Sequence, residues 1–174
     1  MRIVIDAYNV MRSTGFADDY DLKVLKNQRV QFLSLLSEYA NSSKNRIIAV
    51  FDGGGSGEIF GNSETYGPVE VRYSAGGETA DDVIKKISAD AQNPRDIVVI
   101  TSDKEISYYV RNCGATVVSA AEFYSKIKLK AAIMDKEVTS AEYFEKHIKG
   151  FDDTEEKRIN HKKNKGKKRR INNW

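Results

Sequence analysis

Short apolar runs alternate with helical patterns of hydrophobic positions along the first 130 residues. The run from Ile97 to Ile100 contains only β-branched residues, which is typical of a strand buried on both faces. Comparable runs predict further strands at 3–5, 46–51, 69–73 and 116–118. Because strands that alternate with helices form a parallel sheet covered on both faces, the pattern predicts an α/β fold, a three-layer sandwich around a central parallel sheet.

Four helices are expected between and after these strands. Apolar residues spaced by three or four positions predict one helix over 22–40 and a second over 80–91, which ends before Pro94. A third begins at Asp103 and a fourth after Ser119, each close to a serine followed three residues later by a glutamate, the spacing of a capping box. The pattern then weakens, and a short amphipathic C-terminal helix is expected before the basic end of the chain.

The side chains of the third predicted helix can be assigned to its inner or outer side. Tyr109 and Cys113 fall on its apolar side and are expected in the core. Ser102 and Glu105 are expected to cap its first turn by exchanging hydrogen bonds with the backbone.

Glycine is concentrated in one stretch of the chain. Eight of the twelve glycines lie between residues 53 and 77, more than regular structure tolerates. This stretch is therefore predicted to be mostly loop around the short strand at 69–73. Two interpretations stay open, the lip of a binding site and a plain surface connection.

Composition narrows the class of protein. A chain of 174 residues has room for one domain of ordinary size. Cys113 is the only cysteine, so neither an intramolecular disulfide nor a cysteine zinc site can form, which favours a cytoplasmic location. No apolar run approaches the roughly 20 residues needed to cross a bilayer, so no membrane attachment is expected.

Acidic residues stand just beyond the carboxyl ends of three predicted strands. Asp6 follows the first strand, Asp52 the second, and Asp103 comes shortly after the run at 97–100. Since open parallel sheets bind ligands beyond the carboxyl ends of their strands, these side chains are expected at one rim. Glu78 and Asp81 open the second predicted helix, whose start should lie on the same rim.

Each acid also has a structural interpretation, since Asp103 suits the first turn of a helix and Asp81 could pair with Lys85. Together, however, carboxylates about 4 Å apart repel by about 1 to 4 kcal/mol, which a cation relieves. Ligands that are all oxygen favour a hard ion, so a Mg²⁺ or Mn²⁺ site is predicted. Asp82 points away from the core and is expected to pair with Lys86 instead.

Several other chemistries lack the residues they need. Both histidines, His147 and His161, lie beyond the predicted sheet, so a Ser-His-Asp triad is not expected. The glycine run at 53–57 has no following Lys-Ser or Lys-Thr and does not match G-x-G-x-x-G, which argues against a nucleotide-binding or dinucleotide-binding loop.

Four short motifs occur in order at the predicted strand ends and at the start of the second helix. They are Ile5-Asp6-Ala7-Tyr8-Asn9-Val10, Val50-Phe51-Asp52, Gly77-Glu78-Thr79-Ala80-Asp81 and Thr101-Ser102-Asp103. In this order they resemble the NYN domain of the YacP-like kind, a branch of the PIN-like nuclease superfamily. The resemblance covers roughly residues 1 to 128 and implies a PIN-like fold and a metal-dependent endoribonuclease that hydrolyses RNA phosphodiester bonds.

The resemblance also implies roles for individual residues. The acids that would surround the Mg²⁺ or Mn²⁺ ion are Asp6, Asp52, Glu78, Asp81 and Asp103. Asp6, Asp81 and Asp103 are expected to be catalytic together with Asn9, which would orient Asp6 or the scissile phosphate unless it is an ordinary turn asparagine. Ser102 and Thr101 are candidates for contacting phosphate.

Basic residues gather at the end of the chain. Residues 157–174 hold nine of the 28 Lys and Arg and no Asp or Glu, which leaves 19 basic against 25 acidic residues, or −6, in the rest. Such a block either solubilises the protein or binds nucleic acid. The expected organisation is a nuclease domain at 1–130, a helical extension at 131–156 and a disordered basic tail at 157–174.

The expected partner of this tail is RNA, either single-stranded RNA or mRNA, with the ribosome as a further docking surface. The residues expected to contact it are Lys162, Lys163, Lys165, Lys167, Lys168, Arg169 and Arg170.

Rival functions are distinguished by single features. A non-catalytic RNA-binding or ribosome-associated module of the same fold is the main alternative, and it would lack metal-dependent turnover. A phosphatase of the haloacid-dehalogenase kind needs a second aspartate two residues after Asp6, where Tyr8 stands. A DNA flap nuclease needs a helical arch or a duplex-binding insertion, and none is evident in the sequence.

Overall fold

The computed structural model describes residues 1–17, 22–43, 45–53 and 63–133. The chain divides into two compact units, Met1–Ala131 and Ala132–Trp174, and every element described below belongs to the first. The predicted basic tail at 157–174, most of the helical extension at 131–156 and much of the glycine-rich loop lie outside the described residues.

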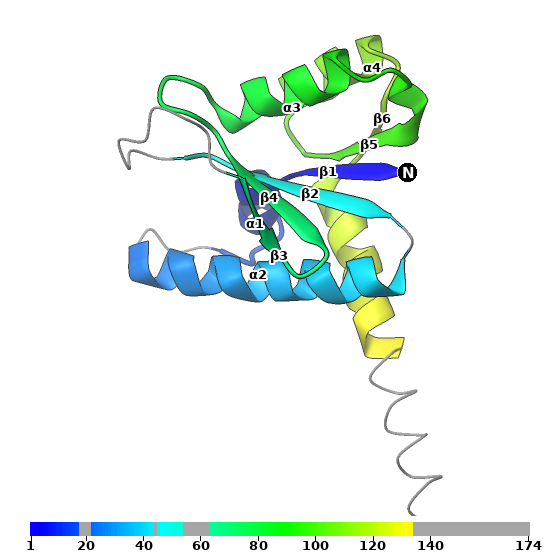
Figure 1. Cartoon of the computed structure of the whole chain (residues 1–174). Coiled ribbons are helices and arrows are strands. Elements are labelled where there is room, and N and C mark those ends of the chain that lie inside the picture. Colours follow the sequence, from blue (N-terminus) through cyan, green and yellow to red (C-terminus); the bar gives the residue numbers. More distant parts are fainter. Residues whose placement is uncertain (18–21, 44, 54–62, 134–174) are drawn as a thin grey trace, which may run out of the picture. The chain divides into compact units, whose positions relative to one another are not determined.

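A six-stranded sheet forms the centre of the first unit (Figure 1). Its strands are β1 Arg2–Asp6, β2 Arg46–Phe51, β3 Ser63–Tyr66, β4 Val69–Tyr73, β5 Ile97–Ile100 and β6 Thr116–Val118. They lie in the order β3-β4-β2-β1-β5-β6, and all neighbouring pairs are parallel except β3 with β4. The predicted α/β fold with a central, largely parallel sheet is confirmed.

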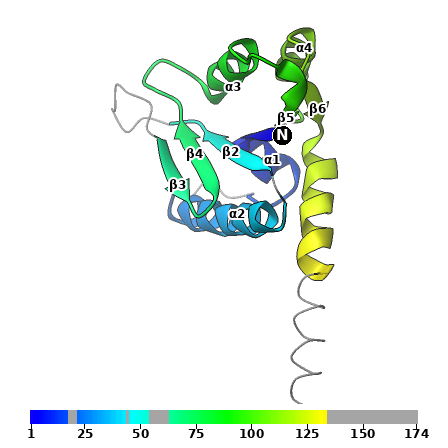
Figure 2. The same ribbon diagram turned by 45° about the vertical axis from the view of Figure 1, so that its right-hand side comes forward.

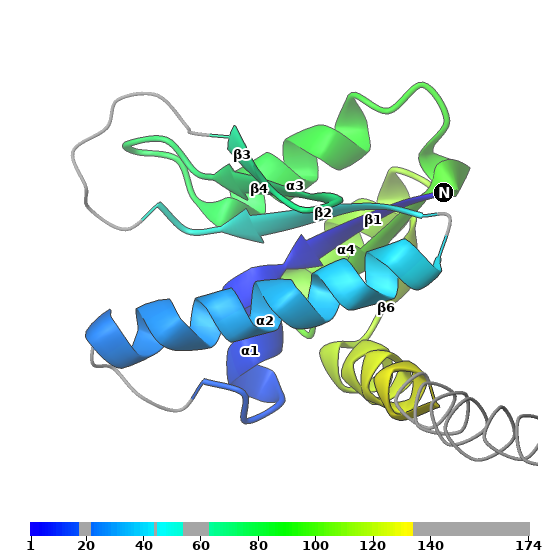
Figure 3. The ribbon, with the colours of Figure 1, turned by 60° about the horizontal axis from the view of Figure 1, so that its bottom comes forward.

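Helices cover both faces of the sheet. They are α1 Ala7–Ser13, α2 Leu22–Ser42, α3 Ala80–Ala89 and α4 Lys104–Asn112, with a short 3-10 helix η1 at Pro94–Asp96. Residues 120–131 are also helical. The pair α3 and α4 lies on one side of the sheet and α2 on the other, which Figure 2 shows in a turned view. In Figure 3, α1 lies with α2 on the same side.

The alternation of side chains along β1 explains the two layers. Ile3 and Ile5 point into one hydrophobic cluster, which includes Phe32 of α2. Val4 points into the other cluster with Ile84 of α3. Successive residues of a strand face opposite sides, so a strand segment buried on both faces has to be apolar throughout, as β1 is from Ile3 to Ile5.

Helix α1 and strand β3 could not be predicted from the sequence. Helix α1 has seven residues and follows β1 with no glycine or proline between them, so no break in the pattern separates the two elements. Strand β3 is polar and mostly exposed, because it pairs only with β4 at the edge of the sheet.

Four details of α4 and α3, the third and second helices predicted from the sequence, differ from expectation. Asp103, rather than Ser102, is the N-cap of α4, and its side chain accepts hydrogen bonds from two backbone amides of the first turn. Tyr109 is 40% exposed, so it does not lie in the core, and Cys113 is only partly buried. Asp82 forms a capping box with Thr79 at the start of α3 in place of the expected pair with a lysine, because its backbone position at the third residue of the helix suits that bond.

Candidate active site

The site begins where the neighbouring strands β1 and β5 end. Their register pairs Ile5 with Ile100, so the next residues, Asp6 and Thr101, come side by side. Both side chains are buried, and the Thr101 hydroxyl donates a hydrogen bond of 2.9 Å to Oδ2 of Asp6. A carboxylate at the mouth of the sheet is thereby fixed from the neighbouring strand.

The turn from β5 into α4 is tied to the same point. The Asp103 amide donates to the Thr101 hydroxyl oxygen over 3.1 Å, and the Ser102 amide donates to Oδ1 of Asn9 in α1 over 2.8 Å. Oδ1 of Asp103 accepts from the amides of Glu105 and Ile106. These bonds leave Oδ2 of Asp103 with no hydrogen bond among the described residues.

Asp81 reaches the site from the first turn of α3. The N-cap Thr79 and Asp82 exchange hydrogen bonds in a capping box, which fixes where this helix begins. Asp82 is used in this cap and is exposed, whereas Asp81 is partly buried and lines the pocket. The structure therefore places Asp81 in the pocket and Asp82 in the helix cap.

Asp52 follows β2 and is held by a close contact between two backbone segments. The Ser74 hydroxyl donates to Oδ1 of Asp52 over 2.8 Å and accepts from the Gly53 amide over 2.9 Å. A Cβ atom at Gly53 would lie 2.2 Å from the Ser74 carbonyl oxygen, so only glycine permits this approach.

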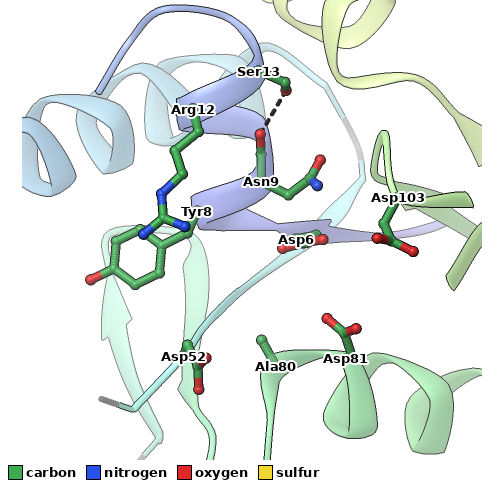
Figure 4. A pocket seen from close by; sticks show the side chains of 9 residues that line it. All are labelled: Asp6, Tyr8, Asn9, Arg12, Ser13, Asp52, Ala80, Asp81 and Asp103. Atoms are coloured by element: carbon green, nitrogen blue, oxygen red, sulfur yellow. Dashed lines mark hydrogen bonds between the residues drawn. The ribbon is translucent and has the colours of Figure 1, made fainter. Parts of the chain in front are cut away.

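These elements enclose a cavity of about 500 Å³. Figure 4 shows the carboxyl groups of Asp6, Asp81 and Asp103 around a common space, with Asp52 apart from these three. Four carboxylates line the cavity together with residues of α1 and α3. The full lining is Asp6, Tyr8, Asn9, Arg12, Ser13, Asp52, Ala80, Asp81 and Asp103.

Burial and the neighbouring charges change the acidity of these carboxyl groups. The pKa of Asp6 is raised to about 6, chiefly by burial and to a smaller extent by the negative charges of Asp81 and Asp103, against a lowering effect of the Thr101 hydrogen bond. Burial, followed by the charge of Asp103, also raises the pKa of Asp81. The three groups therefore repel one another electrostatically, which is the condition that a bound cation relieves.

Other residues predicted for the site lie elsewhere. Glu78 lines a separate pocket with Arg72 and Lys86, and its Oε2 accepts a long hydrogen bond of 3.4 Å from the Ala75 amide. Ser102 lines a third pocket. The seven basic residues of the tail, 162–163, 165 and 167–170, lie outside the described residues.

Sequence reasoning missed Tyr8, Arg12 and Ser13 as lining residues. The Arg12 guanidinium lies 5.8 Å from the centre of the Tyr8 ring, and that ring packs edge-on against Phe51 at 5.1 Å. Tyr8 and Arg12 are four positions apart, so they share a face of α1. Recognising that α1 is a helix would have placed both beside Asp6.

The carboxylates of the pocket fit a divalent cation that keeps part of its water shell. No group of three or more histidine, cysteine, aspartate or glutamate side chains in the described part of the chain is arranged to hold a metal ion. Mg²⁺, however, commonly keeps several waters and takes only one or two protein carboxylates directly. Asp6, Asp81 and Asp103, as hard oxygen donors with mutual repulsion, fit an ion held in that way.

A largely parallel sheet with acids beyond β1, β2 and β5 and at the start of α3 defines the class of this protein as a PIN-like NYN fold. The family comparison agrees, because the model of the YacP-like NYN domain matches residues 3–174. The chain belongs to the YacP-like NYN domain family, which is of the PIN-like nuclease type.

Solved structures show the same fold. A crystal structure of a mutant of Rae1 (YacP) from Bacillus subtilis is 25% identical, with a TM-score of 0.69 over 80% of this chain and 82% of that one. Another crystal structure of Rae1 (YacP) from Bacillus subtilis is 23% identical with the same TM-score of 0.69, and covers 98% of this chain and 95% of that one. No curated protein matched the chain. None of the described helices is long and apolar enough to span a bilayer.

Proposed function

We propose that the protein is a metal-dependent endoribonuclease that hydrolyses RNA phosphodiester bonds at the pocket of Asp6, Asp81 and Asp103. One observation carries the proposal: carboxylates from β1, α3 and the β5–α4 turn share one cavity, where burial, together with the charges of Asp81 and Asp103, raises the pKa of Asp6 to about 6. Membership in a family of nuclease type supports RNA hydrolysis over binding alone.

Asp6, Asp81 and Asp103 would hold a Mg²⁺ or Mn²⁺ ion, with Asp52 at the edge of the site. When bound, such an ion polarises a phosphoryl oxygen and lowers the pKa of a coordinated water. No nucleophile from the protein is then required. Among the described residues, no histidine lines the cavity, so we assign proton transfer to the carboxylates and to water.

The residues around the acids position the substrate. The Ser102 amide can only donate, so the Asn9 atom that it meets is the amide oxygen, which leaves the Asn9 NH₂ group as a donor for the scissile phosphate. Tyr8 offers a ring face on which a base can stack, and Arg12 brings a positive charge to a pocket that otherwise repels phosphates.

The basic residues at 157–174 are proposed to hold RNA, or RNA of the ribosome, from outside the acidic pocket. If about five of these charges neutralise phosphates of a single strand, the logarithm of affinity falls with the logarithm of salt at a slope of about −3.5. Deleting 157–174 is expected to flatten that slope while divalent ions still bind, and an unchanged slope would make the tail a bystander.

The proposed activity is tested by incubating the protein with single-stranded RNA and Mg²⁺ or Mn²⁺, with EDTA as the metal-free arm. The Asp6→Asn variant is expected to lose activity, whereas Asp90→Asn, which replaces an exposed aspartate at the other end of α3, is expected to keep it. An Asp6→Asn variant as active as the wild type would overturn the assignment.

A non-catalytic RNA-binding module is the second candidate. The observation that favours it is that the described residues contain no group of three acids already arranged around one ion. Parallel assays on RNA, DNA and a small phosphate ester separate the candidates, because the module binds RNA with no turnover of any of the three.

A further inference from the structure

A second concave site adjoins the acidic pocket and has the opposite character. Its volume is about 310 Å³, and its polar lining consists of Thr101, Ser102, Lys104, Ser107, Arg111 and Ser119. None of its lining residues is acidic. The turn from β5 into α4 contributes to both pockets, with Asp103 in the first and the residues on either side of it in the second.

The two cations of this second pocket are available to a ligand. Lys104 and Arg111 are seven positions apart on α4, two turns, so they project from one face about 10 Å apart along the helix. Both are exposed, and neither forms an ion pair with an acid among the described residues. Outside residues 157–174, acidic residues outnumber basic ones. Two cations without an acidic partner beside one concavity therefore indicate a site for an anion.

Two hydroxyl groups complete the pocket. Oγ of Ser102 accepts from the Ala120 amide and Oγ of Ser119 accepts from the Glu122 amide, each over 3.3 Å. A hydroxyl that accepts from an amide keeps its own proton, so both can donate to a ligand oxygen. Ser107, in contrast, donates to the backbone carbonyl of Asp103 and is already used.

We propose that this pocket binds a backbone phosphate of the RNA substrate next to the scissile phosphodiester. The inference rests on the proposed ribonuclease function and adds a second binding point to it. A guanidinium, an ammonium and two hydroxyl donors around one concavity match the charge and the several acceptor oxygens of a phosphodiester. Because Ser102 and Asp103 are consecutive, holding this phosphate selects which phosphodiester lies at the acids.

The test is a double variant, Lys104→Gln with Arg111→Gln. Its matched control is Arg95→Gln with Lys126→Gln, which removes the same two charge types from exposed positions outside this pocket. Binding of a ten-nucleotide uridine RNA is measured in EDTA at several salt concentrations, and thermal unfolding confirms that both variants are folded.

The double variant is expected to bind the RNA about tenfold more weakly or worse. Its salt slope should be smaller by about 0.7, the value for one phosphate of a single strand. In Mn²⁺ its KM should rise with little change in kcat, and the control should match the wild type throughout. An affinity and a salt slope equal to those of the wild type would overturn the proposal.

Binding in EDTA separates this inference from the proposed function. If the wild type cleaves no RNA but the double variant still loses affinity, the enzyme assignment fails and the phosphate pocket stands. If the wild type cleaves RNA and the double variant binds it as tightly as the control, the pocket proposal fails alone.

Discussion

The two pockets that meet at the β5–α4 turn are built from consecutive residues and yet carry opposite charge. The acidic pocket gathers Asp6, Asp81 and Asp103 and raises the pKa of its buried member. The neighbouring pocket has Lys104 and Arg111 with no acid in its lining. The carboxylates of the first pocket repel a polyanion when no cation is bound there, whereas the lysine and arginine of the second pocket attract it.

Under the proposed function, the two pockets would have separate tasks. The carboxylates would recruit a metal ion, and the lysine and arginine would retain the phosphate chain of the RNA. The short turn between them is stiffened by Thr101, which donates to Asp6 and accepts from the Asp103 amide. The distance between the two pockets is thus set by the short turn at residues 101–104.

The largest expected effect is on the rate of RNA cleavage when an acid of the first pocket is replaced. Asp81→Asn should lower RNA cleavage by about a thousandfold, because loss of one charge partner of an ion removes several kcal/mol of transition-state stabilisation. Glu78→Gln should lower it less than about threefold, since Glu78 lines a different pocket. Initial rates in Mn²⁺ measure both, and equal losses would contradict the placement of Glu78.

The next effect concerns stability of the metal-free protein. Raising the pKa of Asp6 from 3.8 to about 6 destabilises the fold by about 3 kcal/mol at neutral pH. Because the pKa of Asp6 is higher in the folded than in the unfolded protein, the folded protein has its full stability below about pH 4. It loses about 3 kcal/mol of that stability as the pH rises through about 6. In EDTA, Asp6→Asn should therefore be more stable than the wild type at pH 7, and this gain should vanish near pH 4.

Urea denaturation at the two pH values measures that difference. The gain at pH 7 should stay below 3 kcal/mol, because the variant also weakens the hydrogen bond from Thr101. A variant that loses stability between pH 4 and 7 as steeply as the wild type would show that Asp6 is not the responsible group.

A smaller effect is expected on substrate affinity from Tyr8, which lines the pocket with the acids. Tyr8→Ala removes a proposed stacking surface, and loss of one base stack costs about 1 to 3 kcal/mol. KM for single-stranded RNA should rise about tenfold or more with little change in kcat. Tyr8→Phe is the control, because it keeps the ring, and a tenfold rise in that variant would point to the hydroxyl instead.

The smallest effect tests how Asp81 is positioned. Thr79→Ala removes the side-chain cap of α3, which is worth about 1 kcal/mol of stability. Thermal unfolding should detect that loss, and cleavage should fall severalfold if the cap also sets the position of Asp81. A stable variant with unchanged activity would show that packing alone places the helix.

The sheet could be predicted from the sequence because its central strands are buried on both faces. The ranges at 46–51 and 97–100 match β2 and β5 to the residue, since a short, continuous run of β-branched and apolar residues is typical of a strand covered on both sides. Helix α1 and strand β3 could not be predicted in the same way. Helix α1 is short and directly follows a strand. Strand β3 consists mostly of polar residues, and it forms because it pairs with β4.

The site could be predicted as far as strand ends determine it. Asp6, Asp52 and Asp103 follow directly from the parallel register, because the carboxyl ends of such strands share one edge. Glu78 stands in the loop before α3, where Gly77 has a φ of +85°, and the direction of a side chain after such a turn cannot be derived from spacing. That Asp103 rather than Ser102 caps α4 could not be predicted, because the neighbouring residues form hydrogen bonds with residues far away in the sequence. Thr101 bonds to Asp6, and Ser102 bonds to Asn9.

The central claim is that three acids from separate elements hold one divalent cation. A crystal soaked in Mn²⁺ and measured for anomalous scattering tests it most directly. The account predicts a manganese peak between Asp6, Asp81 and Asp103 that is lost in the Asp6→Asn variant. Manganese bound only at other carboxylates, in a protein that still cleaves RNA, would contradict it.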